Sequence, residues 1–369
     1  MQQYAGFLTI PRDEPGEAVA LLRKVHLLAI RTLFHAPADA RVAALRDWLQ
    51  ILLHERPDAV IEAIGSPDVL PFVLSRAPVP SFAPNLLAAL GTSSENFLWD
   101  APFRELVIGD RVATFDPSAR AILINPAGIT IELASGAVWN GSPSQQAAIS
   151  LLGHVQLALH DTNPLAAIEA HPDKSGNALS FGGRAIEEWE HSIREALALI
   201  AQSLPAWLNE FRRVMRRLVP VGYDAERHVS ASYREAPGIA YLSLHPDPLT
   251  MAEAIVHESQ HTKLNVATWL DPVLRNGQTC WTQSPVRPDL RPLLGVLLAL
   301  HAFVPVSVMH RVLAESGHPI ARERRFDERR REVLATNEKS LAIVRQHADP
   351  TPLGERIISA LEQTLRALH

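Results

Sequence analysis

Two stretches near the amino terminus place apolar residues three and four positions apart. They are EPGEAVALLRKVHLLAIRTLF at 14–34 and DARVAALRDWLQILLHERPDAVIEAI at 39–64. This period puts the apolar side chains on one side of a helix, so residues 1–100 are predicted to form a helical region. Between about 105 and 140 the pattern changes to short β-branched and alternating pieces broken by Gly, Pro, Asp and Asn. A small β region is therefore predicted within 101–150.

Helical periodicity dominates the rest of the chain, residues 151–369. It returns already at about 145–160 and resumes from about 183 to 217, where Pro205 is expected to interrupt the helix. Three further helices are predicted at about 292–314, at 322–345 and from 353 onward. The expected fold is mainly α with a small β section, an α+β fold whose helices form a bundle.

A strand followed by a capped helix is predicted near residue 250. IAYLSLH at 239–245 has the β-branched and aromatic composition of a strand. Thr250 and Glu253 then form the T-x-x-E pattern of a capping box, and the Asp-Pro pair at 271–272 marks a helix end. Residues 251–270 are therefore predicted to be helical.

This predicted helix contains a metal-binding pattern, H-E-x-x-H, formed by His257, Glu258 and His261. Residues four apart on a helix lie on the same face, so the two imidazoles can bind one ion. Position 267, where a metzincin would have its third histidine, holds Ala267. The pattern therefore predicts a metal site of another class.

A catalytic metal needs a third protein ligand besides the two histidines. His301 is the first candidate because it lies inside the apolar run at 292–309, where an imidazole must find a hydrogen bond or a metal. A core histidine held by a hydrogen bond is the alternative for it. Other candidates that stay open are His245, His310, Asp271 and Asp289. The active site is expected between the helices at 251–270 and 292–314.

Composition excludes several classes of partner. Hydrophobic residues make up 47% of the 369 residues and charged residues 20%, which is typical of a globular protein. The net charge of -5 gives no basic field, so neither nucleic acid nor a membrane is an expected partner. Cys280 is the single cysteine, which excludes an internal disulfide. The first residues lack the pattern of a signal peptide, and a cytoplasmic protein is expected.

Other histidines and arginines are expected to be structural. His154 and His160 are six residues apart and are predicted on different faces of a helix. The segment ARERRFDERRREV at 321–333 mixes Arg with Glu and Asp, which is typical of a solvated helix face. A groove for an acidic leader peptide is the alternative for this segment.

The region around the motif resembles a known family. PGIAYLSLHPDPLTMAEAIVHESQHTKLNVATWLDPV, the later Trp281, and SPVRPDLRPLLGVLLALHAFVPV resemble the HExxH-type proteins encoded beside ribosomally synthesised, post-translationally modified peptides. DVLPFVLSRA and IEEWEHSIREALALIAQSLPAWLNEFRRVMRRLVPV agree with that family's layout, so the likeness extends over most of the chain.

This resemblance implies an iron(II)- and 2-oxoglutarate-dependent dioxygenase that hydroxylates a β-carbon in a precursor peptide. His257 and His261 then become iron ligands, with His301 as the proposed third. Arg291 is the candidate to hold the distal carboxylate of 2-oxoglutarate, with Arg287 in reserve, because arginine pairs with carboxylates through two parallel hydrogen bonds. An ion pair of Arg291 with Asp289 or Glu253 is the structural alternative.

Two other functions remain open at this point. The first is a zinc peptidase in which Glu258 acts as the general base, since imidazoles suit Zn(II) as well as iron(II). The second is an inert peptide-binding protein of a biosynthetic cluster. Under the hydroxylase hypothesis, Glu258 has no obligatory proton to move and is expected to orient a ligand or a bound water.

Overall fold

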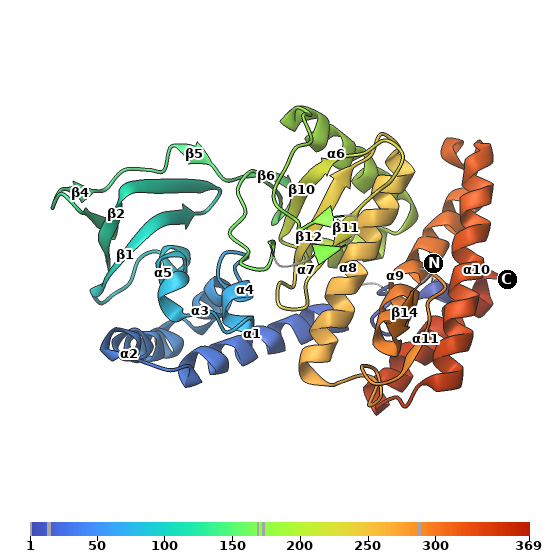
Figure 1. Ribbon diagram of the computed structural model, residues 1–369, viewed down its shortest axis with the longest axis horizontal. Helices are drawn as coiled ribbons and strands as arrows, with labels where there is room; N and C mark the ends of the chain where they lie inside the picture. Colours follow the sequence, from blue (N-terminus) through green and yellow to red (C-terminus); the bar gives the residue numbers. More distant parts are fainter. Residues whose placement is uncertain (1, 13–15, 168–169, 172–173, 287–288) are drawn as a thin grey trace.

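The computed structural model describes residues 2–12, 16–167, 170–171, 174–286 and 289–369 (Figure 1). About 51% of the chain is helix and 20% is strand, and the strands form several sheets. This confirms the predicted α+β class. The reserve residue Arg287 lies outside the described residues.

The amino-terminal half of the structure combines short helices with an antiparallel sheet. The helices are α1 (Glu17–His35), α2 (Ala40–Glu55), α3 (Pro57–Ile64), α4 (Leu70–Leu74) and α5 (Ala83–Leu90), with 3-10 turns η1 (Gln2–Tyr4) and η2 (Val79–Ser81). The sheet has the order β1-β2-β3-β4, with β5 paired to β2, and contains β1 (Phe97–Ile108), β2 (Arg111–Asn125), β3 (Gly128–Leu133), β4 (Val138–Trp139) and β5 (Gln145–Gln146). Helices α1 to α5 thus lie within the segment predicted to be helical, and the sheet begins at Phe97, slightly before the predicted β region. Both share one hydrophobic core.

A second sheet lies at the centre of the molecule (Figure 1). Its order is β11-β12-β10-β7-β6, with β7, β10 and β12 parallel. The strands are β6 (Ala148–Leu152), β7 (Val155–Ala158), β10 (Arg217–Tyr223), β11 (Ser230–Ala231) and β12 (Ile239–Leu244). All six residues of β12 are buried, because protein covers both faces of the sheet there.

The helix predicted at about 145–160 is wrong. This segment forms β6 and β7, which are joined by a tight turn at Gly153, whose φ of 59° is a left-handed conformation that glycine adopts without strain. Pairing of β7 with β10 decides the outcome, since strand formation depends on tertiary partners more than helix formation does. His154 therefore lies in this turn, and the predicted placement of His154 and His160 on a helix is wrong as well.

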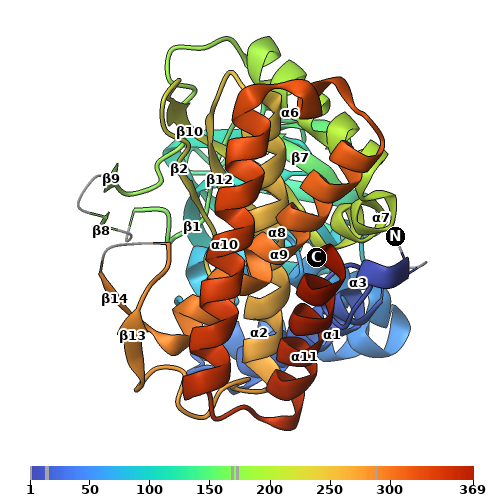
Figure 2. The same cartoon turned by 90° about the vertical axis from the view of Figure 1, so that its right-hand side faces the viewer.

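The carboxyl-terminal half is a set of long helices beside this sheet (Figure 2). They are α6 (Ile186–Ser203), α7 (Pro205–Val214), α8 (Pro248–Leu270), α9 (Leu293–Glu315), α10 (Arg324–His347) and α11 (Pro352–Leu368), with the 3-10 turn η3 (Pro319–Arg322). The described residues also form two two-stranded sheets. One pairs β8 (Ala170–His171) with β9 (Lys174–Ser175), and the other pairs β13 (Trp281–Gln283) with β14 (Leu290–Pro292). Pro205 separates α6 from α7 as predicted.

α9 is long and apolar enough to cross a membrane by length and composition, with a mean hydropathy of 1.9 over its most apolar window. However, 72% of that window is buried inside the protein, where α9 packs against α8, α10 and α11. This packing makes α9 a core helix of the protein.

Candidate metal centre

The motif helix α8 begins one turn earlier than its predicted cap. Asp247 is the N-cap, and its carboxylate accepts hydrogen bonds from the backbone of Leu249 and Thr250 at 3.4 and 3.3 Å. Glu253 does not close the predicted capping box, because its carboxylate binds His310 and Arg329 instead. The capping box was therefore wrong, although the predicted helix 251–270 lies inside α8.

α8 is a core helix with one opening. Between residues 251 and 267, His257 and His261 are half-buried and every other residue is buried. The opening therefore coincides with the two imidazoles of the motif, as a metal site that must admit a ligand requires.

The two histidine rings lie against each other at the opening. Their centroids are 4.4 Å apart with an interplanar angle of 86°, and the ring of Phe303 from α9 packs on His257 at 4.4 Å. Potential ligand atoms of His257, Glu258 and His261 all lie within 4.8 Å of one another. This separation suits two imidazoles that bind one ion.

The electrostatics of the group also fit a metal. Burial lowers the pKa of His261, and the nearby carboxylate of Glu258 opposes this effect only in part. His261 is therefore kept neutral, which is the form of imidazole that binds metals. Glu258 is 2% exposed, and its Oε2 makes no hydrogen bond to any other described residue. A buried carboxylate oxygen in this state calls for a partner such as a cation or a water molecule.

His301 lies near this group but is held by the backbone. It is fully buried on α9, and its Nε2 is 3.0 Å from the carbonyl oxygen of Leu8. Burial, together with the positive charge of Lys263, lowers the pKa of His301 to about 3. Within the described residues, His301 is not among the side chains that share the 4.8 Å group with the motif. This is the arrangement of a core histidine with a hydrogen bond.

The remaining third-ligand candidates are bound elsewhere. Nδ1 of His245 accepts from the backbone of Asp247 at 3.0 Å, and Nε2 of His310 lies 2.8 Å from Glu253. Asp271 accepts from Thr351, and Asp289 pairs with Arg291. The motif residues are thus the group that the described structure brings together.

Arg291 lies in β14, directly before α9. Its Nε is 2.8 Å from Asp289, and both side chains are partly exposed, so the structural alternative for Arg291 is present. Arg291 pairs across the hairpin with Thr282, on the opposite side from the exposed Trp281 and Leu290. Such an exposed pair contributes little stability and can open for another carboxylate.

Sequence reasoning missed a buried polar cluster behind the motif. Lys263, 2% exposed, donates to the carbonyl of Thr9 and forms an ion pair with Glu210 of α7 at 2.5 Å. Gln260 donates to the same carbonyl at 3.2 Å. These contacts hold α8 against the amino-terminal segment and α7. A lysine inside a helix that is buried over most of its length was the available signal.

Most arginines at 321–333 pair with acidic residues of the protein. Arg329 pairs with the buried Glu253, Arg325 with Asp247, and Arg324 with Glu328. Burial raises the pKa of Glu253, but His310 and Arg329 lower it more. This segment therefore joins α10 to α8 and forms a partly solvated face.

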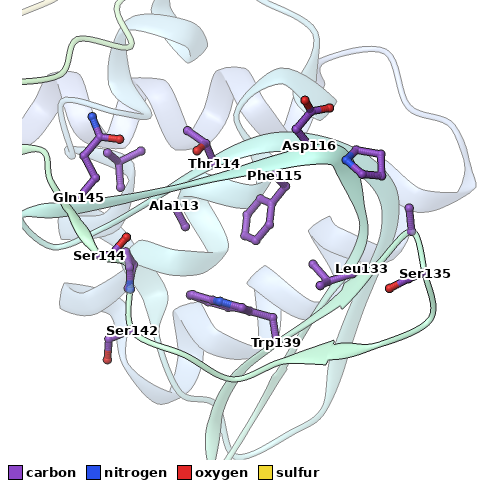
Figure 3. Close-up of a pocket in the computed structure, with 14 residues that line it drawn as sticks. Ala113, Thr114, Phe115, Asp116, Leu133, Ser135, Trp139, Ser142, Ser144 and Gln145 are labelled. Carbon is purple, nitrogen blue, oxygen red and sulfur yellow. The ribbon is translucent and has the colours of Figure 1, made fainter.

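The larger cavities lie away from the histidines. A hollow of about 390 Å³ in the first sheet is lined by Phe115 and Trp139 together with the serines at 135, 142 and 144 (Figure 3). Another of about 850 Å³ lies among the amino-terminal helices. The candidate metal centre lies where the half-buried His257 of α8 meets Phe303 of α9.

No protein-family model matches this chain, and no curated protein matches it.

Proposed function

We propose that the protein is an iron(II)- and 2-oxoglutarate-dependent dioxygenase that hydroxylates a β-carbon of a residue in a ribosomally made precursor peptide. The observation that carries the proposal is the coincidence of the H-E-x-x-H imidazoles with the one opening in the middle of α8. The choice of reaction rests on the sequence resemblance and on Arg291.

His257 and His261 would hold the metal, beside the contact of α8 with Phe303 of α9. Iron(II) with 2-oxoglutarate and O2 supplies the oxidation, in which one oxygen atom enters a C–H bond and the other enters succinate as CO2 is released. Neutral imidazoles suit iron(II), and an open metal face leaves positions for the keto acid and O2. Phe303 shields His257 on one side and limits access of water.

A row of half-buried residues on α9 supports a cosubstrate site between Arg291 and the proposed metal. Gly295, Ala299 and Phe303 follow Arg291 at intervals of four and are all half-buried. Residues four apart lie on one side of a helix, and a Cβ on Gly295 would approach that of Arg291 at 3.9 Å. The two small residues leave room for a dicarboxylate whose distal end reaches Arg291.

The antiparallel packing of α8 and α9 indicates how far Arg291 lies from the proposed metal along α9. Glu253 contacts His310, and one turn later His257 contacts Phe303. Continuing one more turn places His261 opposite the turn around Ala299. Six residues separate Leu293 from Ala299, about 9 Å along the helix axis. An arginine side chain and a five-carbon dicarboxylate together span a distance of this order.

The proposed partner is the precursor peptide, with no nucleic acid and no membrane, and the proposed location is the cytoplasm. A zinc peptidase is the second candidate, favoured by one observation. The free Oε2 of Glu258 lies in the same group as the imidazoles, where a general base would take a proton from a metal-bound water.

Mass measurement of the product tests the reaction class. The protein would be incubated with the precursor peptide of its own gene cluster, iron(II), 2-oxoglutarate and air. We expect a gain of one oxygen atom with an equal amount of succinate. Peptide fragments that form with zinc and without 2-oxoglutarate would establish the peptidase. No reaction under either condition, with the peptide still bound, would establish an inert binding protein.

Three variants separate the enzyme candidates. Glu258→Gln should lower hydroxylation by about 10–100-fold through the ligand environment, whereas loss of a general base costs about a hundred to ten thousand fold.

Ala299→Leu and Arg291→Ala should each raise the 2-oxoglutarate concentration needed for half-maximal rate. Val312→Leu, also half-buried on α9, is the matched control and should leave it unchanged. Equal 2-oxoglutarate dependence in all three would refute the proposed cosubstrate site.

A further inference from the structure

The cavity of about 850 Å³ lies at the junction of α1, α2 and the α4–η2 segment. Its volume falls within the range of roughly 300–1,000 Å³ typical of ligand sites. The floor is aliphatic and aromatic, formed by Leu28, Leu33, Val42, Val73, Val79 and Phe82. Exposed residues at the end of α1 and around η2 line its mouth, so the cavity opens to solvent.

The rim of this cavity is basic on a molecule of net charge -5. Arg31 and Arg76 are exposed, and neither guanidinium makes a hydrogen bond or an ion pair to any other described residue. Asp39, the acidic residue of the rim, is already bound, because it caps α2 through the backbone of Val42 and pairs with Arg41. The two free arginines therefore set the local charge.

The backbone at Arg76 is unusual for this residue type. Its φ is +59°, and it follows the C-cap of α4, where glycine is the common residue. Hydrogen bonds from Arg76 to Val73 and from Ala77 to Phe72 close the helix end there. An arginine in this left-handed conformation costs stability relative to glycine.

The backbone of the rim decides which form of ligand fits. Pro37, Pro78 and Pro80 lack an N–H, and no strand edge borders the cavity. A ligand chain would therefore have to satisfy its own backbone hydrogen bonds, as a helix does.

From these observations we infer that this cavity binds an amphipathic helical peptide with an aliphatic face and acidic flanks. Leucine-type side chains fill the floor, and carboxylates pair with Arg31 and Arg76. This docking site does not depend on the metal chemistry, and it is separate from the candidate metal centre.

Fluorescence anisotropy with the intact protein tests the inference. The probe is a fluorescein-labelled peptide of repeated Glu-Leu-Leu-Glu-Glu-Ala-Leu units. We expect saturable binding that weakens as salt is added, about fivefold weaker binding in Arg31→Gln, and a similar loss in Arg76→Gly. Arg213→Gln, which changes an exposed arginine of α7 outside the cavity, is the matched control and should bind as wild type.

Arg76→Gly distinguishes a binding role of this arginine from a purely structural role. Glycine relieves the left-handed backbone, so this variant should melt at a higher temperature while it binds the probe less tightly. Equal binding of a peptide with Lys in place of Glu would overturn the inference. So would unchanged affinity in both arginine variants. Binding of decanoate without binding of the peptide would also overturn it and would assign the cavity to a small acid.

Discussion

At the residue scale, the proposed metal site rests on the two imidazoles of α8. His257→Ala and His261→Ala should each lose bound metal, by more than the roughly 10–100-fold typical of residues around the ligands, because each removes a ligand from a two-histidine pair. His301→Ala should keep measurable metal, since the Nε2 of His301 is bound to the carbonyl of Leu8. Metal content after anaerobic purification, with circular dichroism to confirm folding, checks both. Full occupancy in either α8 variant would remove the central claim, and loss in His301→Ala would make His301 the third ligand.

At the element scale, α8 is held in place by the buried pair of Lys263 and Glu210. Lys263→Met should cost about 3–5 kcal/mol of unfolding free energy, because it leaves Glu210 buried without its partner. The double variant Lys263→Met with Glu210→Leu should regain much of this loss. Urea unfolding measures both, and Arg324→Ala, at an exposed ion pair, should change stability by less than about 1 kcal/mol. A single variant as stable as wild type would contradict the anchoring role.

The contact of α1 with the end of α3 should depend on pH. The ring of His26 packs against Gly65, where a Cβ would come within 2.4 Å of it. Burial, with the charges of Arg216 and Arg23, lowers the pKa of His26 from 6.5 to about 4. Between pH 6.5 and 4, His26 is therefore protonated in the unfolded chain but neutral in the folded protein. The contribution of neutral His26 to the free energy of unfolding, roughly 3 kcal/mol, is complete above pH 6.5 and is lost as the pH falls toward 4. His26→Gln should flatten the slope of stability against pH in that window, and an unchanged slope would refute the assignment.

At the scale of the whole molecule, a buried ion pair joins the two large cores. Asp68, beside α4, binds Arg217 at the start of β10 through two contacts of 2.8 Å, and it also accepts from Thr162. Asp68→Ala should destabilise the protein by about 3–5 kcal/mol, since Arg217 is then buried without its partner. Two separate unfolding transitions in this variant would show that the pair couples the cores. Stability equal to wild type would show that apolar packing alone joins them.

The sequence determined the elements whose signal is local. Period-3.6 patterns predicted α1, α2, α9, α10 and α11 because an amphipathic or fully apolar helix contains its own hydrogen bonds. The H-E-x-x-H spacing placed His257 and His261 on one face for the same reason. Of the second sheet, β12 was predicted from IAYLSLH, but β6, β7 and β10 escaped prediction. They become strands through pairing between segments about sixty residues apart (Gln156 with Arg217).

Only the tertiary structure decided which polar residues share a partner. Spacing along the chain left His301, His310 and Asp289 all open as possible ligands, with His301 first. Packing gave each a different partner, namely the Leu8 carbonyl, Glu253 and Arg291. Packing also left the side chains of His257 and His261 half-buried on α8 and buried that of Lys263. Local spacing fixes which side chains share a helix face, whereas burial and ion pairing depend on segments that meet only when the chain has folded.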